Sequence, residues 1–143
     1  MKKLILVLAI ACLFVQAQAQ RLAPKEVPEA VAAAFKQGNP NIKIVAWNKA
    51  GGSYMAMFKS EKMEVVATYD VEGKLMNTLT QVAVADLPPT VMEYFKTTYP
   101  KSKVEKALKM TNALSVITSY QLKTSEMLLL FKPDGSFSKE VKY

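Results

Sequence analysis

Few side chains in this sequence could carry out covalent or acid–base chemistry. The 143-residue chain has no histidine, and its one cysteine is Cys12. Histidine is the commonest general base and cysteine a common nucleophile, and both are main ligands of zinc. The carboxylates Asp70, Glu72 and Asp134 lie in segments typical of turns, where solvated hairpin ends account for them. The sequence therefore predicts a protein that is not an enzyme.

Two further patterns are typical of chemistry. Ser136 and Lys139 have the Ser-x-x-Lys spacing of penicillin-binding enzymes, but they stand on a predicted strand and lack the accompanying motifs. Met55, Met57 and Met63 are soft thioether groups of the kind that can hold Cu(I). No histidine or cysteine accompanies them, so adaptable core packing is the simpler interpretation. We expect no cofactor and no metal.

The positive charge of the chain consists almost entirely of lysine. The formal net charge is +7, or about +5 without Lys2 and Lys3, and the one arginine is Arg21. Because arginine forks for phosphates and bases are missing, we expect no nucleic-acid partner. A basic patch comprises Lys101, Lys103, Lys106 and Lys109. It is either a solvated loop and edge strand or a surface for an anionic partner.

Aromatic and methionine side chains supply the candidates for a binding surface. The candidate sheet face consists of Trp47, Tyr54, Met55, Met57 and Tyr69. Apolar groups point to both sides of the strand predicted at 53–59, because alternate residues of a strand face opposite ways. This surface is either buried between the two halves of the chain or left open for a partner. The alternation leaves open which parity is exposed, and whether Trp47 belongs to the surface or to the core.

These candidates must be positioned by a unit that occurs twice. The first copy has Val27-Pro28, Val31, Phe35, Pro40 and Glu72-Gly73. About sixty positions later stand Leu87-Pro88, Val91, Phe95, Pro100 and Asp134-Gly135. The recurring residues are apolar, proline or glycine, which set backbone and core, so the repeat indicates architecture rather than chemistry.

Each copy is predicted to form a short helix followed by four strands. Apolar stripes between the two prolines of each copy predict the helices. The strand-like runs are 42–49, 53–59, 63–70 and 74–82, then 102–110, 113–122, 126–132 and 136–143. In the last run, Phe137 and Val141 share a parity, which predicts that they face the same side. Short connections require antiparallel neighbours.

The predicted fold class is α+β, with two tandem modules at 20–83 and 84–143. Each module is a short helix packed on a four-stranded antiparallel meander. We expect the two modules to share one continuous core and to form one globular unit, because about 124 residues fit a single compact domain.

The first nineteen residues have the pattern of a signal peptide, 1–19. Lys2 and Lys3 precede an apolar stretch at 4–15, and Ala17-Gln18-Ala19 offers a small-x-small cleavage pattern. The stretch is shorter than the roughly 20 residues that span a bilayer. We expect cleavage after Ala19, no membrane span and a periplasmic or secreted protein. Lipid attachment at Cys12 is the alternative.

A shared set of residues runs through both copies. In the first copy it is Val27-Pro28, Phe35, Asn39-Pro40, Trp47, Tyr54 and Tyr69-Asp70-x-x-Gly73. The second copy has Leu87-Pro88, Phe95, Tyr99-Pro100 and Asp134-Gly135, with Ala107 in place of the tryptophan. Over nearly the whole chain after the leader, this set resembles the PepSY-like, beta-lactamase-inhibitor-like family of exported bacterial proteins. The resemblance implies a helix-plus-antiparallel-sheet module outside the cytoplasm, with no catalytic residues to carry over.

We therefore expect a non-enzymatic binding or interaction protein of the bacterial envelope that uses an open antiparallel sheet face. Its partner would be another envelope or extracellular protein. One alternative is an inhibitor of a secreted or periplasmic hydrolase, in which a loop such as 49–53 enters the target's cleft. The other is a structural or assembly module without a small ligand. The family name suggests inhibition by fold analogy, which does not establish function.

Overall fold

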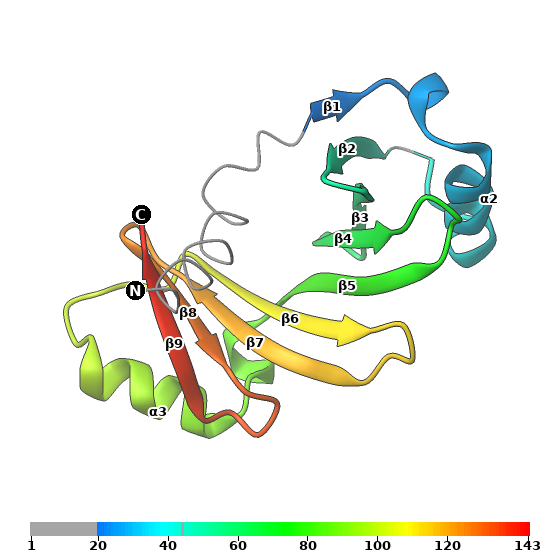
Figure 1. Cartoon of the computed structure of the whole chain (residues 1–143). Helices are drawn as coiled ribbons and strands as arrows, with labels where there is room; N and C mark the ends of the chain where they lie inside the picture. Colours follow the sequence, from blue (N-terminus) through cyan, green and yellow to red (C-terminus); the bar gives the residue numbers. More distant parts are fainter. Residues whose placement is uncertain (1–19, 44) are drawn as a thin grey trace, which may run out of the picture.

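One continuous antiparallel sheet organises the chain (Figure 1). The structure, a computed structural model, describes residues 20–43 and 45–143. In these residues nine strands lie side by side in the order in which they occur in the chain. The strands are β1 (Gln20–Leu22), β2 (Ala46–Ala50), β3 (Ser53–Ser60), β4 (Met63–Tyr69), β5 (Leu75–Val82), β6 (Lys106–Asn112), β7 (Ile117–Lys123), β8 (Met127–Phe131) and β9 (Phe137–Lys142).

Two α-helices precede β2 and β6, as the sequence predicts. They are α2 (Glu29–Gly38) and α3 (Pro89–Thr98). A proline stands at the N-cap of each helix. Its fixed φ and missing N–H do not destabilise the helix at this position, because no helical hydrogen bond needs that N–H. Single 3-10 turns, η1 (Pro24–Glu26) and η2 (Val84–Asp86), lie ahead of the helices.

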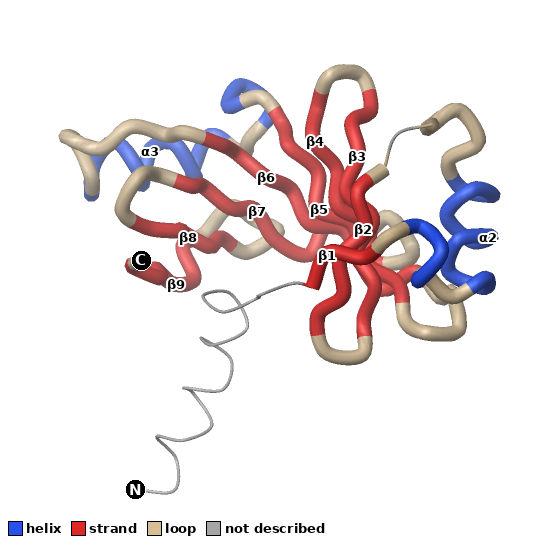
Figure 2. The backbone as a smooth tube through the Cα atoms, turned by 90° about the horizontal axis from the view of Figure 1, so that it is seen from above, coloured by secondary structure: helices blue, strands red, loops and turns tan. Residues whose placement is uncertain are grey.

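Both helices pack on the same face of the sheet. Directly opposite residues of antiparallel neighbours point to the same side. The strand register joins Phe58, Val65, Thr80, Lys109, Tyr120 and Phe131 in one row. Phe58 belongs to the core beneath α2 and Phe131 to the core beneath α3. We call this side the helix face and the other side the open face. Figure 2 shows the two helices at opposite ends of the sheet.

The core is divided into two clusters, so the prediction of one continuous core is wrong. Val31 and Phe35 of α2 pack on the first half of the sheet, and Val91 and Phe95 of α3 pack on the second. Between the clusters, the middle of the helix face of β5 and β6 is polar, whereas Leu75 packs with the first cluster and Val82 and Ala107 pack with the second. The residues of this polar strip are Thr78, Thr80, Lys109 and Thr111. Because these side chains do not bury well, neither helix extends its core across them.

The sheet, by contrast, continues across the predicted module boundary. β5 and β6 pair from Asn77 opposite Asn112 to Val82 opposite Ala107. The α+β class with antiparallel strands is confirmed, but two separate four-stranded meanders are not, because the nine strands form one sheet. β1 adds an edge strand that no sequence pattern indicated, since three residues are too few to show alternation.

Two glycines hold the turns of the sheet against the helices. Gly73 has φ +85° and Gly135 has φ +84°. A Cβ at Gly73 would come within 2.5 Å of the Ala30 carbonyl oxygen at the start of α2. At Gly135 it would come within 2.2 Å of Thr90 Oγ1 in α3. Both positions therefore require glycine for the backbone angle and for space.

A β-bulge overturns the predicted alternation in β9. The register shifts between Leu130 and Phe131, so Phe137 lies opposite Phe131 on the helix face. Val141 lies opposite Leu128 on the other face. Phe137 and Val141 therefore do not share a face, because the bulge adds one residue to the strand.

The predicted signal peptide, residues 1–19, lies outside the described residues, so cleavage after Ala19 and lipid attachment at Cys12 remain predictions. Within residues 20–43 and 45–143, no helix is both long enough and apolar enough to cross a membrane.

Candidate functional site

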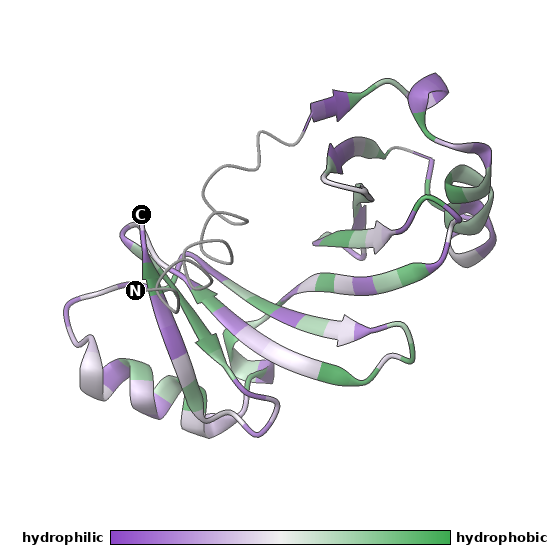
Figure 3. Ribbon diagram, viewed as in Figure 1, coloured by the Kyte–Doolittle hydropathy of each residue, from purple (hydrophilic) through white to green (hydrophobic). Residues whose placement is uncertain are grey.

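The open face carries a row of apolar side chains that crosses five strands. The register from β2 to β6 aligns Ala46, Met57, Val66, Leu79 and Met110. All five are partly exposed, and none belongs to either core cluster. Among the described residues, no helix packs on this row, which we call the apolar band. Figure 3 shows the alternation of hydrophobic and hydrophilic residues along the strands that produces it.

Mainly polar rows flank the apolar band. The row on one side consists of Asn48, Thr68, Asn77 and Asn112, with Met55 on β3. The row on the other side consists of Lys59, Glu64 and Gln81 and then Leu108 on β6. Lys106 pairs with Glu64, and this charged hydrogen bond lowers the pKa of the Glu64 carboxyl. An apolar centre with a polar rim is the usual organisation of a protein interface.

Methionines give the open face an adaptable surface. Asn48 Nδ2 donates a hydrogen bond to Met57 Sδ at 3.7 Å. Ser53 Oγ donates to Met76 Sδ, also at 3.7 Å, and Met76 is 47% exposed. Methionine is unbranched and polarizable, so such side chains can repack against partners of different shape.

The apolar band ends in a hollow of about 760 Å³ beside the start of β2. Ala46, Met57 and Val66 of the band line it, and Ile42 of the segment between α2 and β2 closes one side. The charged residues Lys59 and Glu64 also line the hollow. A partner that covers the band could insert a side chain here.

The structure separates the residues of the predicted candidate face. Met55 and Met57 lie on the open face, but Trp47, Tyr54 and Tyr69 lie on the helix face at 5%, 7% and 4% exposure. The prediction that the three aromatic residues are part of an open face is therefore wrong. Their parity is opposite to that of the methionines, and α2 covers them: Phe35 meets Trp47 edge-on at 5.4 Å.

The four lysines of the basic patch do not form one surface. Lys106 lies on the open face, where it pairs with Glu64. Lys109 is three residues further along β6 and faces the other side, opposite Thr80. Lys101 and Lys103 lie in the segment between α3 and β6. A patch of four cooperating lysines is thus not present, because a strand sends odd-spaced residues to opposite faces.

The methionine group is also divided. Met63 shares the parity of buried Val65, whereas Met55 and Met57 point to the open face. The three thioethers therefore do not converge on one ion. In residues 20–43 and 45–143, no three His, Cys, Asp or Glu side chains cluster as metal ligands would.

The acidic turn residues organise hairpins. Asp70 Oδ1 accepts hydrogen bonds from the backbone N–H groups of Glu72 and Lys74, at 3.0 and 2.9 Å. Asp134 Oδ1 accepts from the hydroxyl and the N–H of Ser136, which lowers the pKa of the Asp134 carboxyl. Ser136 is thus engaged in its own turn. These hydrogen bonds give Asp70 and Asp134 a structural role, because they hold the backbone of the two turns.

Sequence reasoning missed four members of the apolar band, Ala46, Val66, Leu79 and Met110. For three of them the sequence did contain a signal. Short hairpin loops fix which residues stand opposite Met57, and that register extends the apolar row to Ala46 on one side and to Val66 and Leu79 on the other. Met110 required knowledge that β5 pairs with β6, which no short loop indicates.

A family model described as "Putative beta-lactamase-inhibitor-like, PepSY-like" matches the chain twice, at residues 13–77 and 52–139. The chain belongs to this PepSY-like family. No curated protein matches it.

Solved structures show the same fold as this PepSY-like chain. A structure described as a putative periplasmic protein from Bacteroides eggerthii has a TM-score of 0.74 at 15% identity, covering 81% of this chain and 88% of its own. A DUF2874 family protein from Bacteroides ovatus has a TM-score of 0.69 at 24% identity, with 80% and 86% coverage. A BLIP-like protein from Bacteroides fragilis has a TM-score of 0.66 at 21% identity, with 85% and 87% coverage.

Proposed function

We propose that this PepSY-like chain is a non-enzymatic interaction protein of the bacterial envelope, and that its open sheet face docks another protein. The observation that carries the proposal is the apolar band, a row across five strands that no helix covers in the described residues. Contiguous apolar surface rimmed by polar groups is a mark of interaction sites. The adjoining hollow supplies a place for an anchoring side chain.

The location and the organisation of the chain belong to the same proposal. The leader pattern supports export, and the B. eggerthii neighbour is described as a putative periplasmic protein. We further infer two modules, 20–83 and 84–143, joined by the β5–β6 pairing. The equivalent places of Phe35 and Phe95 and of Gly73 and Gly135 support this division.

The partner is an envelope or extracellular protein rather than a nucleic acid. Both signs of charge stand beside the apolar band, with Lys59 and Lys106 near Glu64. A rim of mixed charge suits a protein surface, whereas a phosphate backbone requires a one-sided positive field.

Capture of envelope proteins on the immobilised chain tests the proposal. The variant carries Met57→Glu and Leu79→Glu, which place two charges in the apolar band. Val84→Glu is the matched control, because Val84 is 41% exposed and lies in η2, outside the band. The double variant should lose a partner that both the original chain and the control retain. A partner bound equally by all three chains would contradict the assignment of the open face.

A second candidate is inhibition of a hydrolase, which the family description favours. The β2–β3 turn at Gly51–Gly52 follows directly from the strands of the apolar band. It could enter a cleft while the band supplies contact area. Titration of a serine β-lactamase with the protein tests this target: a stoichiometric loss of hydrolysis supports inhibition, and unchanged hydrolysis at saturating protein excludes that enzyme.

A further inference from the structure

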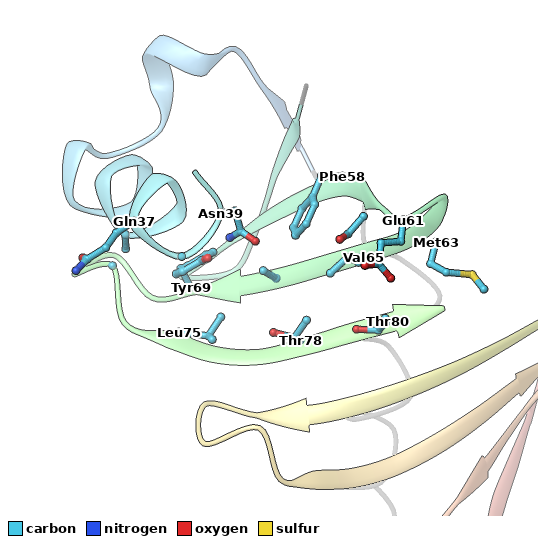
Figure 4. Close-up of a pocket in the computed structure, with 15 residues that line it drawn as sticks. Gln37, Asn39, Phe58, Glu61, Met63, Val65, Tyr69, Leu75, Thr78 and Thr80 are labelled. Atoms are coloured by element: carbon cyan, nitrogen blue, oxygen red, sulfur yellow. The ribbon is translucent and has the colours of Figure 1, made fainter. Parts of the chain in front are cut away.

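A second hollow, of about 660 Å³, lies on the helix face between α2 and β5 (Figure 4). It opens on the helix face, whereas the apolar band lies on the open face, although its lining shares Phe58 and Val65 with the hollow at the end of the band. The second repeat has an equivalent position beside α3, where the protein's own aromatic side chains occupy the space. The side chains that occupy it there indicate which chemical group fits the hollow beside α2.

The helix spacing and the strand register define the equivalent positions. Ala34 and Tyr94 each stand one residue before the buried phenylalanine of their helix. Leu75 lies opposite Tyr69. Phe137 lies opposite Phe131 in the same way.

Beside α3, aromatic side chains close the space. Tyr94 stacks on Phe137, with the ring centroids 4.5 Å apart and the planes at 13°. It also meets Phe131 edge-on at 5.8 Å. Tyr99, just after the helix, donates a hydrogen bond to the Glu140 carboxylate. The second half of the chain therefore supplies its own rings and its own acceptor for a phenolic hydroxyl.

Beside α2, the same four positions hold small or polar residues. Ala34 replaces Tyr94, Asn39 replaces Tyr99, Leu75 replaces Phe137 and Thr78 replaces Glu140. All four of these residues line the hollow. In Figure 4, Asn39, Tyr69 and Leu75 lie together at one end of it. Two tyrosines and a phenylalanine that close the space beside α3 are thus missing beside α2. Ala67, which also lines the hollow, is smaller than Leu129 at the equivalent place.

We propose that this hollow binds the ring of a tyrosine presented by a segment of another polypeptide. The ring takes the place that Tyr94 takes beside α3, packing on Leu75 and against the wall formed by Tyr69. Tyr69 takes the place of Phe131, which meets Tyr94 edge-on beside α3, and such an edge-on contact favours an aromatic ring over an aliphatic group of similar area. Thr78 offers its hydroxyl group to the bound phenol, and Asn39 offers its amide oxygen, since Asn39 Nδ2 already donates to the Phe35 carbonyl oxygen at 3.1 Å.

The length and the charge of the hollow favour a polypeptide over a free phenol. The hollow follows β4 from Tyr69 to Met63, which is roughly 20 Å at about 3.3 Å per residue. One ring fills only one end of it. At the far end lies Glu61, the charged side chain among the lining residues. An extended segment with a tyrosine at one end and a basic residue at the other complements this arrangement.

Titration monitored by amide chemical shifts tests the proposal. The probe is the blocked peptide acetyl-Tyr-Ala-Ala-Ala-Lys-amide, compared with the same peptide carrying leucine for tyrosine and with p-cresol. We expect saturable shifts at Gly38, Asn39 and Gly73, and about tenfold weaker binding of the leucine peptide. Equal binding of the two peptides would overturn the ring site. Binding of p-cresol as tight as that of the tyrosine peptide would overturn the polypeptide partner.

Filling the hollow from within provides the variant. Ala34→Tyr should abolish the shifts while keeping or raising the melting temperature, because the equivalent tyrosine fits beside α3. Ala33→Tyr is the matched control, since Ala33 is exposed on the same helix. It should leave peptide binding unchanged. Binding that survives Ala34→Tyr in a folded protein would contradict the proposal.

The reciprocal variant moves the site to the other half. Tyr94→Ala combined with Tyr99→Asn and Phe137→Leu should open the equivalent space and produce new shifts at Thr98 and Gly135 with the tyrosine peptide. If this variant folds and gains no binding, the missing rings do not define the site. Should it fail to fold, the Ala34→Tyr comparison still decides, because that variant adds side-chain contacts instead of removing them.

Discussion

Phe35 is the residue on which the first core depends most. It is 3% exposed, and its ring meets Trp47 and Phe58 edge-on at 5.4 and 5.2 Å. Phe35→Ala should lower the free energy of unfolding by about 3–5 kcal/mol, because the change removes buried area and leaves a cavity. Phe95→Ala should cost a similar amount, since Phe95 is 4% exposed in the second core. Chemical denaturation measures both, and losses under about 1 kcal/mol would show that neither ring is an anchor.

The Tyr99–Glu140 pair gives a prediction about alkaline pH. The hydrogen bond to the carboxylate is the main cause that raises the pKa of Tyr99 to about 12. An unfolded tyrosine ionises near pH 10, so the bond contributes its full stability below about pH 10. The contribution is lost as the pH rises from about 10 to 12. Glu140→Ala should return the pKa of Tyr99 toward its ordinary value, which a carbon-13 titration of the labelled ring reports. An unchanged Tyr99 titration in the variant would contradict the pairing.

At the scale of elements, each helix is tied to a turn of the sheet by a glycine. Gly73→Ala and Gly135→Ala should each destabilise the protein by about 1 kcal/mol or more, from the positive φ and the contacts with Ala30, or with Pro88 and Thr90. Gly52→Ala is the control, since a Cβ at this position would meet no atom within 4 Å beyond its chain neighbours, and its φ is not positive. Thermal unfolding compares the three variants. If Gly73→Ala and Gly52→Ala unfold at the same temperature, the close packing of Gly73 against the start of α2 does not contribute to stability.

Several elements could be predicted from the sequence because their signals are local. The prolines and apolar stripes located α2 and α3, and the turn residues located the hairpins. The site was predicted less well. Alternation alone does not say which parity a helix covers, so Trp47 was grouped with Met57 although α2 buries it. The bulge in β9 could not be predicted from the sequence either. Phe137 and Val141 are four residues apart in the chain whether or not the strand contains a bulge, so their spacing does not reveal it.

At the scale of the whole molecule, the two cores share the sheet but no side chains. They are joined by β5 and β6, and the polar strip in the middle of these two strands separates them. A defect in one core should therefore loosen that half more than the other. In Phe35→Ala, hydrogen exchange should speed up at the amides of β3 and β4 while the amides of β7 and β8 keep most of their protection. Equal loss of protection in both halves would show that the chain unfolds as one unit.

The order of the strands also has a consequence for how fast the chain folds. Every strand pairs only with its neighbours in the sequence, so no pairing has to wait for a distant segment to arrive. Proteins rich in contacts between sequence neighbours fold faster than those with long-range pairing, because closing a short loop costs less entropy. We expect refolding to be fast for a sheet of nine strands, with each hairpin able to form independently. The β1–β2 and β5–β6 pairings, which span α2 and α3, close the two longest loops.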